Sequence, residues 1–148
     1  MGHLIRFLVL ANMGRVDLLL KEWKKMYLEE LRVGSGTFFE NYSEFSGCHG
    51  ANGITGALIT QKVLGLGAPM QEDKTVTISP YPGELLWAYG SAKCEDGMIF
   101  LRWSADRDLH ELKMDLTLPE GWKAKYELPF ELNGWTVTVN GKSVNDIK

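Results

Sequence analysis

Apolar residues in the first part of the chain recur at helical spacing. A stripe at positions i, i+1, i+4 and i+5 predicts a helix from about His3 to Asn12, and it consists of Leu4, Ile5, Leu8 and Val9. A second helix is expected from Val16 to about Arg32, and Gly14 suits a left-handed turn between the two. The apolar face of the second helix is predicted to contain Val16, Leu19, Leu20, Trp23, Tyr27 and Leu31. Two helices joined by a short turn predict an antiparallel hairpin.

A third helix is predicted from about Asn52 to Leu64, with Asn52 as its N-terminal cap. Its apolar face is expected to consist of Ile54, Ala57, Leu58 and Gln61. The glycines and the proline of residues 65–69 end this helix. Three helices with large apolar faces cannot bury those faces completely against one another. We therefore expect residues 1–67 to be the end of a larger helical body.

From Lys74 onward, apolar residues recur at every second position, which indicates strands with one buried face. Glu95-Asp96-Gly97 and Asn140-Gly141 are typical hairpin turns. The segments predicted as strands are Thr75–Ile78, Leu85–Gly90, Met98–Trp103, Leu112–Leu118, Ala124–Phe130 and Trp135–Val139. This pattern predicts an antiparallel β-sandwich over residues 68–148. The expected fold class is α+β, with α-helices followed by a sandwich.

Charge and composition exclude several kinds of partner. The formal net charge of −3 leaves no basic stripe to neutralise phosphates, so we expect no nucleic-acid partner. The densest basic cluster is interleaved with acids on the second helix, and we interpret it as a solvated face; its residues are Lys21, Lys24 and Lys25 with Glu22, Glu29 and Glu30. No run reaches the roughly 18 apolar residues that a membrane span needs. Residues 1–13 are interpreted as a buried helix rather than a signal peptide, because Arg6 interrupts the apolar run. The cellular compartment stays open.

No metal site or cofactor is expected. Neither CxxC nor HExxH occurs, and the two cysteines, Cys48 and Cys94, lack partners at metal-ligand spacing. A disulfide between them stays open. Cys48 is interpreted as a small buried residue, since no cation beside it would lower the pKa of its thiol.

The segment between the second and third helices carries the candidate chemistry. Glu40 lies among aromatic residues, including Phe39 and Tyr42, which would desolvate its carboxylate and raise its pKa. Aromatic rings beside a carboxylate also suit a carbohydrate, since they pack on the apolar faces of sugar rings. His49, on the same glycine-rich segment, could donate a hydrogen bond to a substrate hydroxyl. The competing interpretation is that Glu40 is a surface glutamate and His49 a structural residue.

The tryptophans are a second candidate feature. Trp103 and Trp135 fall on apolar strand faces and are predicted to belong to the core. For Trp87 and Trp122 the sequence leaves core and carbohydrate-binding roles open.

Several short motifs resemble the C-terminal end of bacterial α-L-rhamnosidases of glycoside hydrolase family 78. They occur in the family's order and are Thr37-Phe38-Phe39-Glu40, Cys48-His49-Gly50, Val63-Leu64-Gly65-Leu66, Val76-x-Ile78-x-Pro80 and Leu86-Trp87-Ala88-x-Gly90. The resemblance implies that the helices end a six-hairpin (α/α)6 barrel. It also implies that Glu40 is the general base of an inverting mechanism and that His49 lies near the bound rhamnose. Phe39 stands where the family usually has tryptophan.

The resemblance implies a carbohydrate substrate, terminal α-L-rhamnosides, and a partner, namely the missing N-terminal part of the barrel. The family's general acid lies upstream of the matched motifs, so the chain is expected to be inactive alone. An alternative from another class is a non-catalytic module whose sandwich binds a carbohydrate or is purely structural. A third hypothesis keeps the barrel but changes the sugar to a uronic acid. An arginine near Glu40 would favour that sugar, and none occurs between Arg32 and Arg102.

Overall fold

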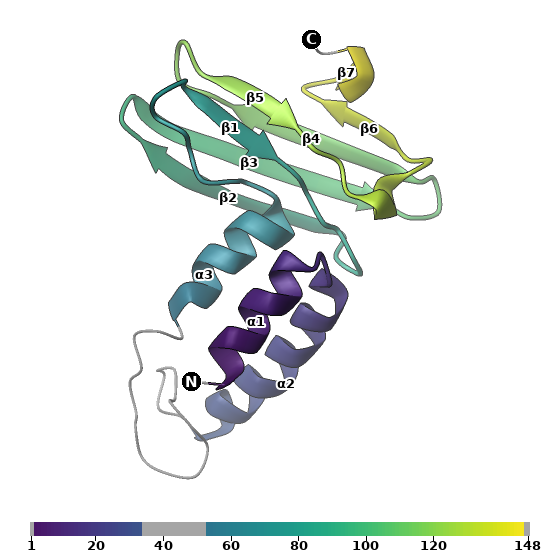
Figure 1. Ribbon diagram of the computed structural model, residues 1–148. Coiled ribbons are helices and arrows are strands. Elements are labelled where there is room, and N and C mark those ends of the chain that lie inside the picture. The colour runs from purple at the N-terminus through teal and green to yellow at the C-terminus, as the bar shows by residue number, and fades with distance from the viewer. Residues whose placement is uncertain (1, 34–52, 147–148) are drawn as a thin grey trace. The chain divides into compact units, whose positions relative to one another are not determined.

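The computed structural model describes residues 2–33 and 53–146. The chain forms two compact units, Met1–Ile59 and Thr60–Lys148, and each has its own internal packing. The first unit is helical, and the second contains the strands (Figure 1). The predicted division into domains of residues 1–67 and 68–148 stays a prediction.

The helical unit begins with the predicted hairpin. Helix α1 spans Gly2–Asn12 and α2 spans Val16–Val33, and the two run antiparallel side by side (Figure 1). Gly14 takes a left-handed conformation, with a φ of 70°, in the turn between them. That conformation is free of steric cost only for glycine, so the sequence predicts this turn correctly.

The predicted buried face of the hairpin is confirmed in part, because Val16, Leu19 and Trp23 of α2 are buried as predicted. On α2 the buried residues follow the spacing 3, 4, 3, 4 and are Val16, Leu19, Trp23, Met26 and Glu30, whereas Leu31 is exposed. On α1 the buried residues are Phe7 and Ala11, and the ring of Phe7 meets that of Trp23 edge to face with centroids 5.8 Å apart. The predicted stripe of α1 is only partly buried, since Leu8 is half-buried and Ile5 and Val9 are exposed. Ile5 and Val9 form an exposed apolar row that Met13 continues in the turn after the helix.

The third helix is present but changes type along its length. Helix α3 spans Ile54–Leu58 with Gly53 as its N-cap, and a π-helix (η2) follows over Ile59–Leu64. The predicted cap, Asn52, lies outside the described residues. The predicted face is partly wrong, because Ala57 and Gln61 are exposed and the buried residues are Thr55, Leu58, Val63 and Leu64. The π-turn after Leu58 holds an extra residue, so Gln61, which is spaced for an α-helix, leaves the buried face.

Over residues 60–146, the sheet unit has seven strands in two sheets. Their bounds are β1 Thr75–Ile78, β2 Trp87–Cys94, β3 Gly97–Asp106, β4 Glu111–Thr117, β5 Lys123–Tyr126, β6 Thr136–Val139 and β7 Lys142–Ser143. The larger sheet has the order β2-β3-β4-β6-β7, and β1 pairs with β5 in a smaller one (Figure 1). Both predicted hairpin turns are confirmed, since β2 pairs with β3 across Glu95-Asp96 and β6 with β7 across Asn140-Gly141.

The prediction of a purely antiparallel sandwich is wrong in one respect. The pairs β4–β6 and β1–β5 are parallel. Parallel neighbours need a crossover connection, and here the chain leaves β4, passes through β5 in the other sheet and returns at β6. Alternation of apolar residues shows which face of a strand is buried and carries no information on its direction, so the sequence did not reveal the crossover.

The core of the sheet unit lies on one face of β3 and β4. Every second residue of these strands is buried: Ile99, Leu101, Trp103 and Ala105 on β3, and Leu112, Met114 and Leu116 on β4. Val76 and Ile78 of β1 belong to the same core. The indole N–H of Trp103 donates a hydrogen bond of 3.0 Å to the carbonyl of Leu64, at the end of the π-helix. Trp103 is confirmed as a core residue, and Trp135 is partly buried against the core.

A polar contact also joins the two sheets. Asp96, in the turn between β2 and β3, accepts a 2.9 Å hydrogen bond from the indole of Trp122, just before β5. The ammonium of Lys74, just before β1, lies 3.0 Å from the same carboxylate oxygen. The hydrogen bond from Trp122, and then Lys74, hold the pKa of Asp96 below its ordinary value. Trp122 is thus a buried structural residue, which answers one of the two questions that the sequence left open.

We expect Trp103→Phe to destabilise the sheet unit by about 2–3 kcal/mol, because it leaves the buried carbonyl of Leu64 without its donor and removes core volume. Urea unfolding followed by circular dichroism measures the change. The matched control is Trp87→Phe, the same substitution at an exposed side chain, which should cost less than about 0.5 kcal/mol. Equal effects of the two substitutions would contradict the structural role of Trp103.

We also expect the helical unit to open more readily than the sheet unit. Its apolar residues Ile5, Val9 and Met13 are exposed, so its helices gain less from burial than the strands do. Amide hydrogen exchange of α1 and α2 should be faster than that of β3 and β4. Equal protection of helices and strands in a monomer would show that the helices are stable on their own.

Candidate functional site

The residues predicted from the sequence to form the site lie outside the described residues. They are Glu40, His49, Phe39 and Tyr42. Their roles therefore stay predictions. The structure describes the helices on either side of this segment, α2 before it and α3 after it.

A hydrogen bond joins the helices that flank the segment. The hydroxyl groups of Tyr27 on α2 and Thr55 on α3 are bonded to each other. Thr55 is buried, and burial raises the pKa of Tyr27. The segment that carries Glu40 and His49 thus connects two helices, α2 and α3, and a hydrogen bond links these helices to each other.

Glu30 is a buried acidic residue on α2. It was predicted to belong to a solvated face, but only 6% of its surface is exposed, and its charge contributes to the raised pKa of Tyr27. Its neighbour Glu29 is exposed and pairs with Arg32 at 2.6 Å. Glu30 lies seven residues after Trp23 and four after Met26, a spacing that places it on the buried face of α2. This spacing is the sequence signal that predicts its burial.

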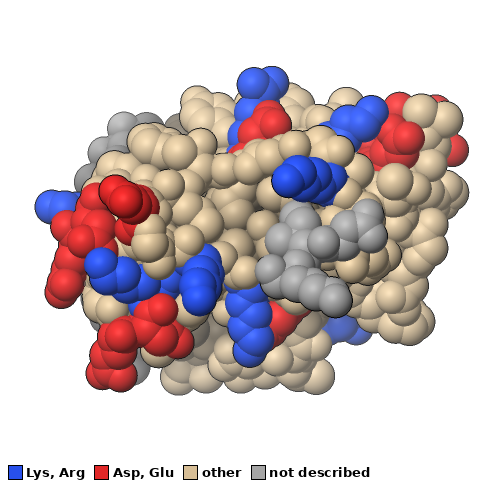
Figure 2. Space-filling view, turned by 90° about the horizontal axis from the view of Figure 1, so that it is seen from above, with Lys and Arg blue, Asp and Glu red and all other residues tan. Residues whose placement is uncertain are grey.

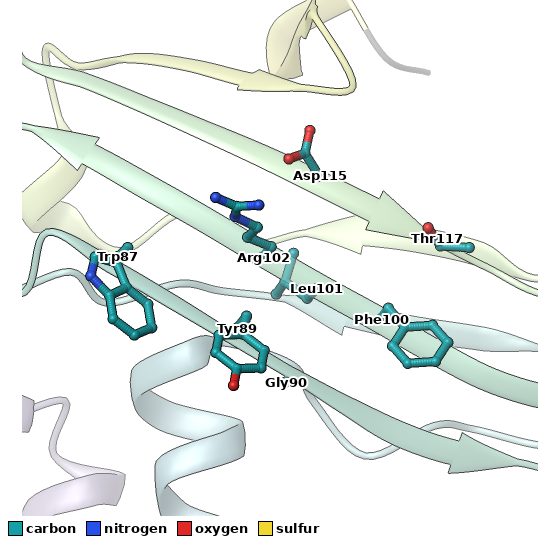
Figure 3. A pocket seen from close by; sticks show the side chains of 8 residues that line it. All are labelled: Trp87, Tyr89, Gly90, Phe100, Leu101, Arg102, Asp115 and Thr117. Atoms are coloured by element: carbon teal, nitrogen blue, oxygen red, sulfur yellow. The ribbon is translucent and has the colours of Figure 1, made fainter.

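A second candidate site lies on the sheet unit. A groove of about 600 Å³ crosses the outer face of β2, β3 and β4, and it is lined by Trp87, Tyr89, Gly90, Phe100, Leu101, Arg102, Asp115 and Thr117 (Figure 3). Trp87 and Tyr89 project from β2, and their rings are stacked with centroids 5.9 Å apart and planes inclined by 19°. Trp87 is 62% exposed, so it belongs to the surface, not to the core.

The remaining chemistry of the described residues is limited. Lysines and arginines are interspersed with acids on the face shown in Figure 2, and no broad basic patch is visible there. In residues 2–33 and 53–146, no group of histidine, cysteine, aspartate and glutamate side chains could hold a metal ion. Within the same ranges no helix has the length and apolar character of a membrane span. Cys94 is buried with its thiol 3.4 Å from the carbonyl of Gly97, while Cys48 lies outside the described residues.

Comparison with solved structures identifies the fold. The chain superposes on a glycoside hydrolase family 78 rhamnosidase from Bacillus sp. GL1 with a TM-score of 0.77 over 93% of its length. The chain shares its fold with part of this rhamnosidase. The resemblance indicated by the sequence motifs is thus confirmed at the level of the fold, as is the α+β class.

The limits of the match are also clear. The two sequences are 23% identical, and the chain spans 15% of the length of the rhamnosidase. No protein-family model matches the sequence. No curated protein matches it either. A likeness at this level of identity concerns the fold alone, so activity and substrate need separate arguments.

We expect Glu30→Ala to destabilise the helical unit by about 1–3 kcal/mol, because it removes a side chain that is buried in the helix packing. The control is Glu29→Ala on the same turn, whose exposed ion pair with Arg32 should contribute less than about 1 kcal/mol. Thermal unfolding followed by helical circular dichroism compares the two variants. A loss of stability in Glu29→Ala as large as in Glu30→Ala would contradict the burial of Glu30.

Proposed function

We propose that this chain is the C-terminal part of an inverting glycoside hydrolase that removes terminal α-L-rhamnose from glycans. The observation that supports this most is the fold shared with a family 78 rhamnosidase over 93% of the chain. The order of the short motifs around Glu40 and His49 supports it independently. A shared fold and a sequence pattern thus point to the same kind of enzyme.

In the proposed mechanism, Glu40 is the general base. Its ionised carboxylate accepts a proton from a water molecule as that water attacks the anomeric carbon, on the face opposite the leaving group. A second carboxylic acid, supplied from outside this chain, protonates the departing oxygen. An inverting pair of this kind stands about 6.5–9.5 Å apart, which leaves room for the water.

The neighbouring residues are proposed to bind the sugar. Phe39 and Tyr42 would pack against the apolar face of the ring, and His49 would donate a hydrogen bond to a hydroxyl group. No metal ion or cofactor takes part in this scheme. The hydrogen bond between Tyr27 and Thr55 supports it, because it joins the two helices on which the segment with these residues begins and ends.

The helical unit is proposed to complete an (α/α)6 barrel with helices from the N-terminal part of the enzyme. The exposed apolar row of Ile5, Val9 and Met13 is consistent with a helix that packs against such a neighbour. Residues 1–67 would then belong to the barrel and residues 68–148 to a C-terminal sandwich domain.

We expect the purified chain to leave aryl α-L-rhamnosides uncleaved, because one carboxylate cannot both protonate the leaving group and activate water. Activity should appear when the chain replaces the corresponding part of the Bacillus rhamnosidase in a chimera. In that chimera, Glu40→Gln should lower kcat by about 10²–10⁴-fold, as expected for loss of a general base. Release of a chromogenic aglycone measures turnover.

The matched control is Glu44→Gln, which changes a second acid of the same segment and should leave most of the activity. Turnover by the isolated chain that Glu40→Gln abolishes would show that the general acid is present in this chain. A folded chimera in which the two variants are equally active would refute the role of Glu40.

A further inference from the structure

The outer face of β2, β3 and β4 carries an arrangement that the fold itself does not need. The pairing of the strands brings Tyr89, Arg102 and Asp115 into one row across the sheet, and Phe100 and Thr117 into the next. All these side chains are on the face opposite the core, because the residues between them along the strands point into it. The three strands thus hold the groove's lining in a fixed register.

Three aromatic side chains on this face are unusually exposed. Trp87 is 62%, Tyr89 73% and Phe100 51% accessible. The rings of Trp87 and Tyr89 are stacked nearly parallel, with centroids 5.9 Å apart, and both lie in the groove (Figure 3). Tyr89 and Phe100 are diagonal neighbours on adjacent strands, a spacing that aromatic side chains can bridge. Contiguous exposed aromatic surface of this kind marks a binding site more often than an ordinary protein surface.

Two charged side chains in the groove have no partner among the described residues. Arg102 and Asp115 are directly opposite each other on β3 and β4, yet neither makes an ion pair or a side-chain hydrogen bond within residues 2–33 and 53–146. On the same strand, by contrast, Lys113 pairs with Glu111 at 2.8 Å, and this contact raises the pKa of Lys113. In the groove, the N–H donors of the Arg102 guanidinium therefore lie beside the two acceptor oxygens of the Asp115 carboxylate. Both groups are available to a ligand (Figure 3).

Exposed aromatic rings beside an unpaired guanidinium and carboxylate favour one class of ligand. We propose that this groove binds a neutral oligosaccharide, with sugar rings stacked on Trp87 and Tyr89 and hydroxyl groups bonded to Arg102 and Asp115. A sugar ring has an apolar face that suits an aromatic ring, and each hydroxyl group both donates and accepts, so it can use a guanidinium and a carboxylate together. The opposite charges of Arg102 and Asp115 balance, which disfavours an anionic polymer such as a nucleic acid.

The length of the aromatic surface sets the minimum size of the ligand. Trp87 and Tyr89 are two residues apart on β2, which places their Cα atoms about 7 Å apart. One sugar ring cannot cover both aromatic rings fully, so the groove suits a chain of at least two sugars. This surface is separate from the proposed catalytic function, because none of its residues belongs to the segment that carries Glu40.

The test uses the whole chain and a panel of soluble polysaccharides. Affinity gel electrophoresis in xylan, glucomannan, galactan or rhamnan should retard the protein in at least one neutral polymer. An oligosaccharide cut from that polymer is then titrated by calorimetry. Trp87→Ala and Arg102→Ala should each weaken binding about tenfold or more, equivalent to about 1.4 kcal/mol, with an unchanged melting temperature. The controls are Phe130→Ala, at an aromatic ring that is 82% exposed outside the groove, and Lys125→Ala, both of which should bind like the parent chain.

Each other outcome overturns the proposal in a recognisable way. If the protein is retarded only in polygalacturonate, an anionic polymer, the ligand is acidic and the proposal of a neutral oligosaccharide is wrong. Binding that survives Trp87→Ala but is lost in Glu40→Gln would assign the carbohydrate to the proposed catalytic segment, with that function left standing. If no neutral polymer binds, and Trp87→Ala converts a self-associating chain to a monomer in sedimentation analysis, the groove is a protein interface.

Discussion

The hydrogen bond from the indole of Trp103 to the carbonyl of Leu64 is the contact on which the sheet unit most depends. It joins strand β3 to the last residue of the π-helix, and both groups are buried where water cannot replace either partner. Two glycines make the approach possible. A Cβ atom on Gly90 would lie 2.8 Å from the side chain of Leu64, and one on Gly65 would lie 2.2 Å from the backbone nitrogen of Pro80. The helix end can be this close to the sheet only because both positions lack a side chain.

That arrangement explains which parts of the fold could be predicted from the sequence. Strands β3 and β4 alternate so regularly that residues such as Leu112 and Met114 could be assigned to the core from their order alone. The helices were located correctly, but their buried faces only in part: Val16, Leu19 and Trp23 of α2 are buried as predicted, whereas Leu31 of α2 and Ile5 and Val9 of α1 are exposed. Glu30 is one example: its charge predicted a solvated position, but its spacing along α2 places it on the buried face. The parallel pairs β4–β6 and β1–β5 depend on a crossover, which no local pattern encodes.

The candidate sites differ in how they could be found. Glu40 and His49 were identified by residue type and by a family pattern, and they lie outside the described residues. The groove on the sheet could not be found that way. Tyr89, Arg102 and Asp115 are far apart in sequence, and only the strand register brings them into one row. Trp87 was a candidate from composition, but its exposure could be decided only by the structure.

The π-helix at Ile59–Leu64 has a consequence for how this chain tolerates insertions and deletions. Its wider turn holds one residue more than an α-helix would, and the hydrogen bond from the amide of Leu66 to the carbonyl of Thr60 spans that extra residue. Removing one exposed residue, such as Gln61, would let the segment relax to an α-helix. The positions after it would then keep their places, because the π-turn already absorbs the extra residue, and Val63 and Leu64 would stay buried. Insertion of one further residue would instead turn these positions by about 100° and carry Val63 and Leu64 out of the core.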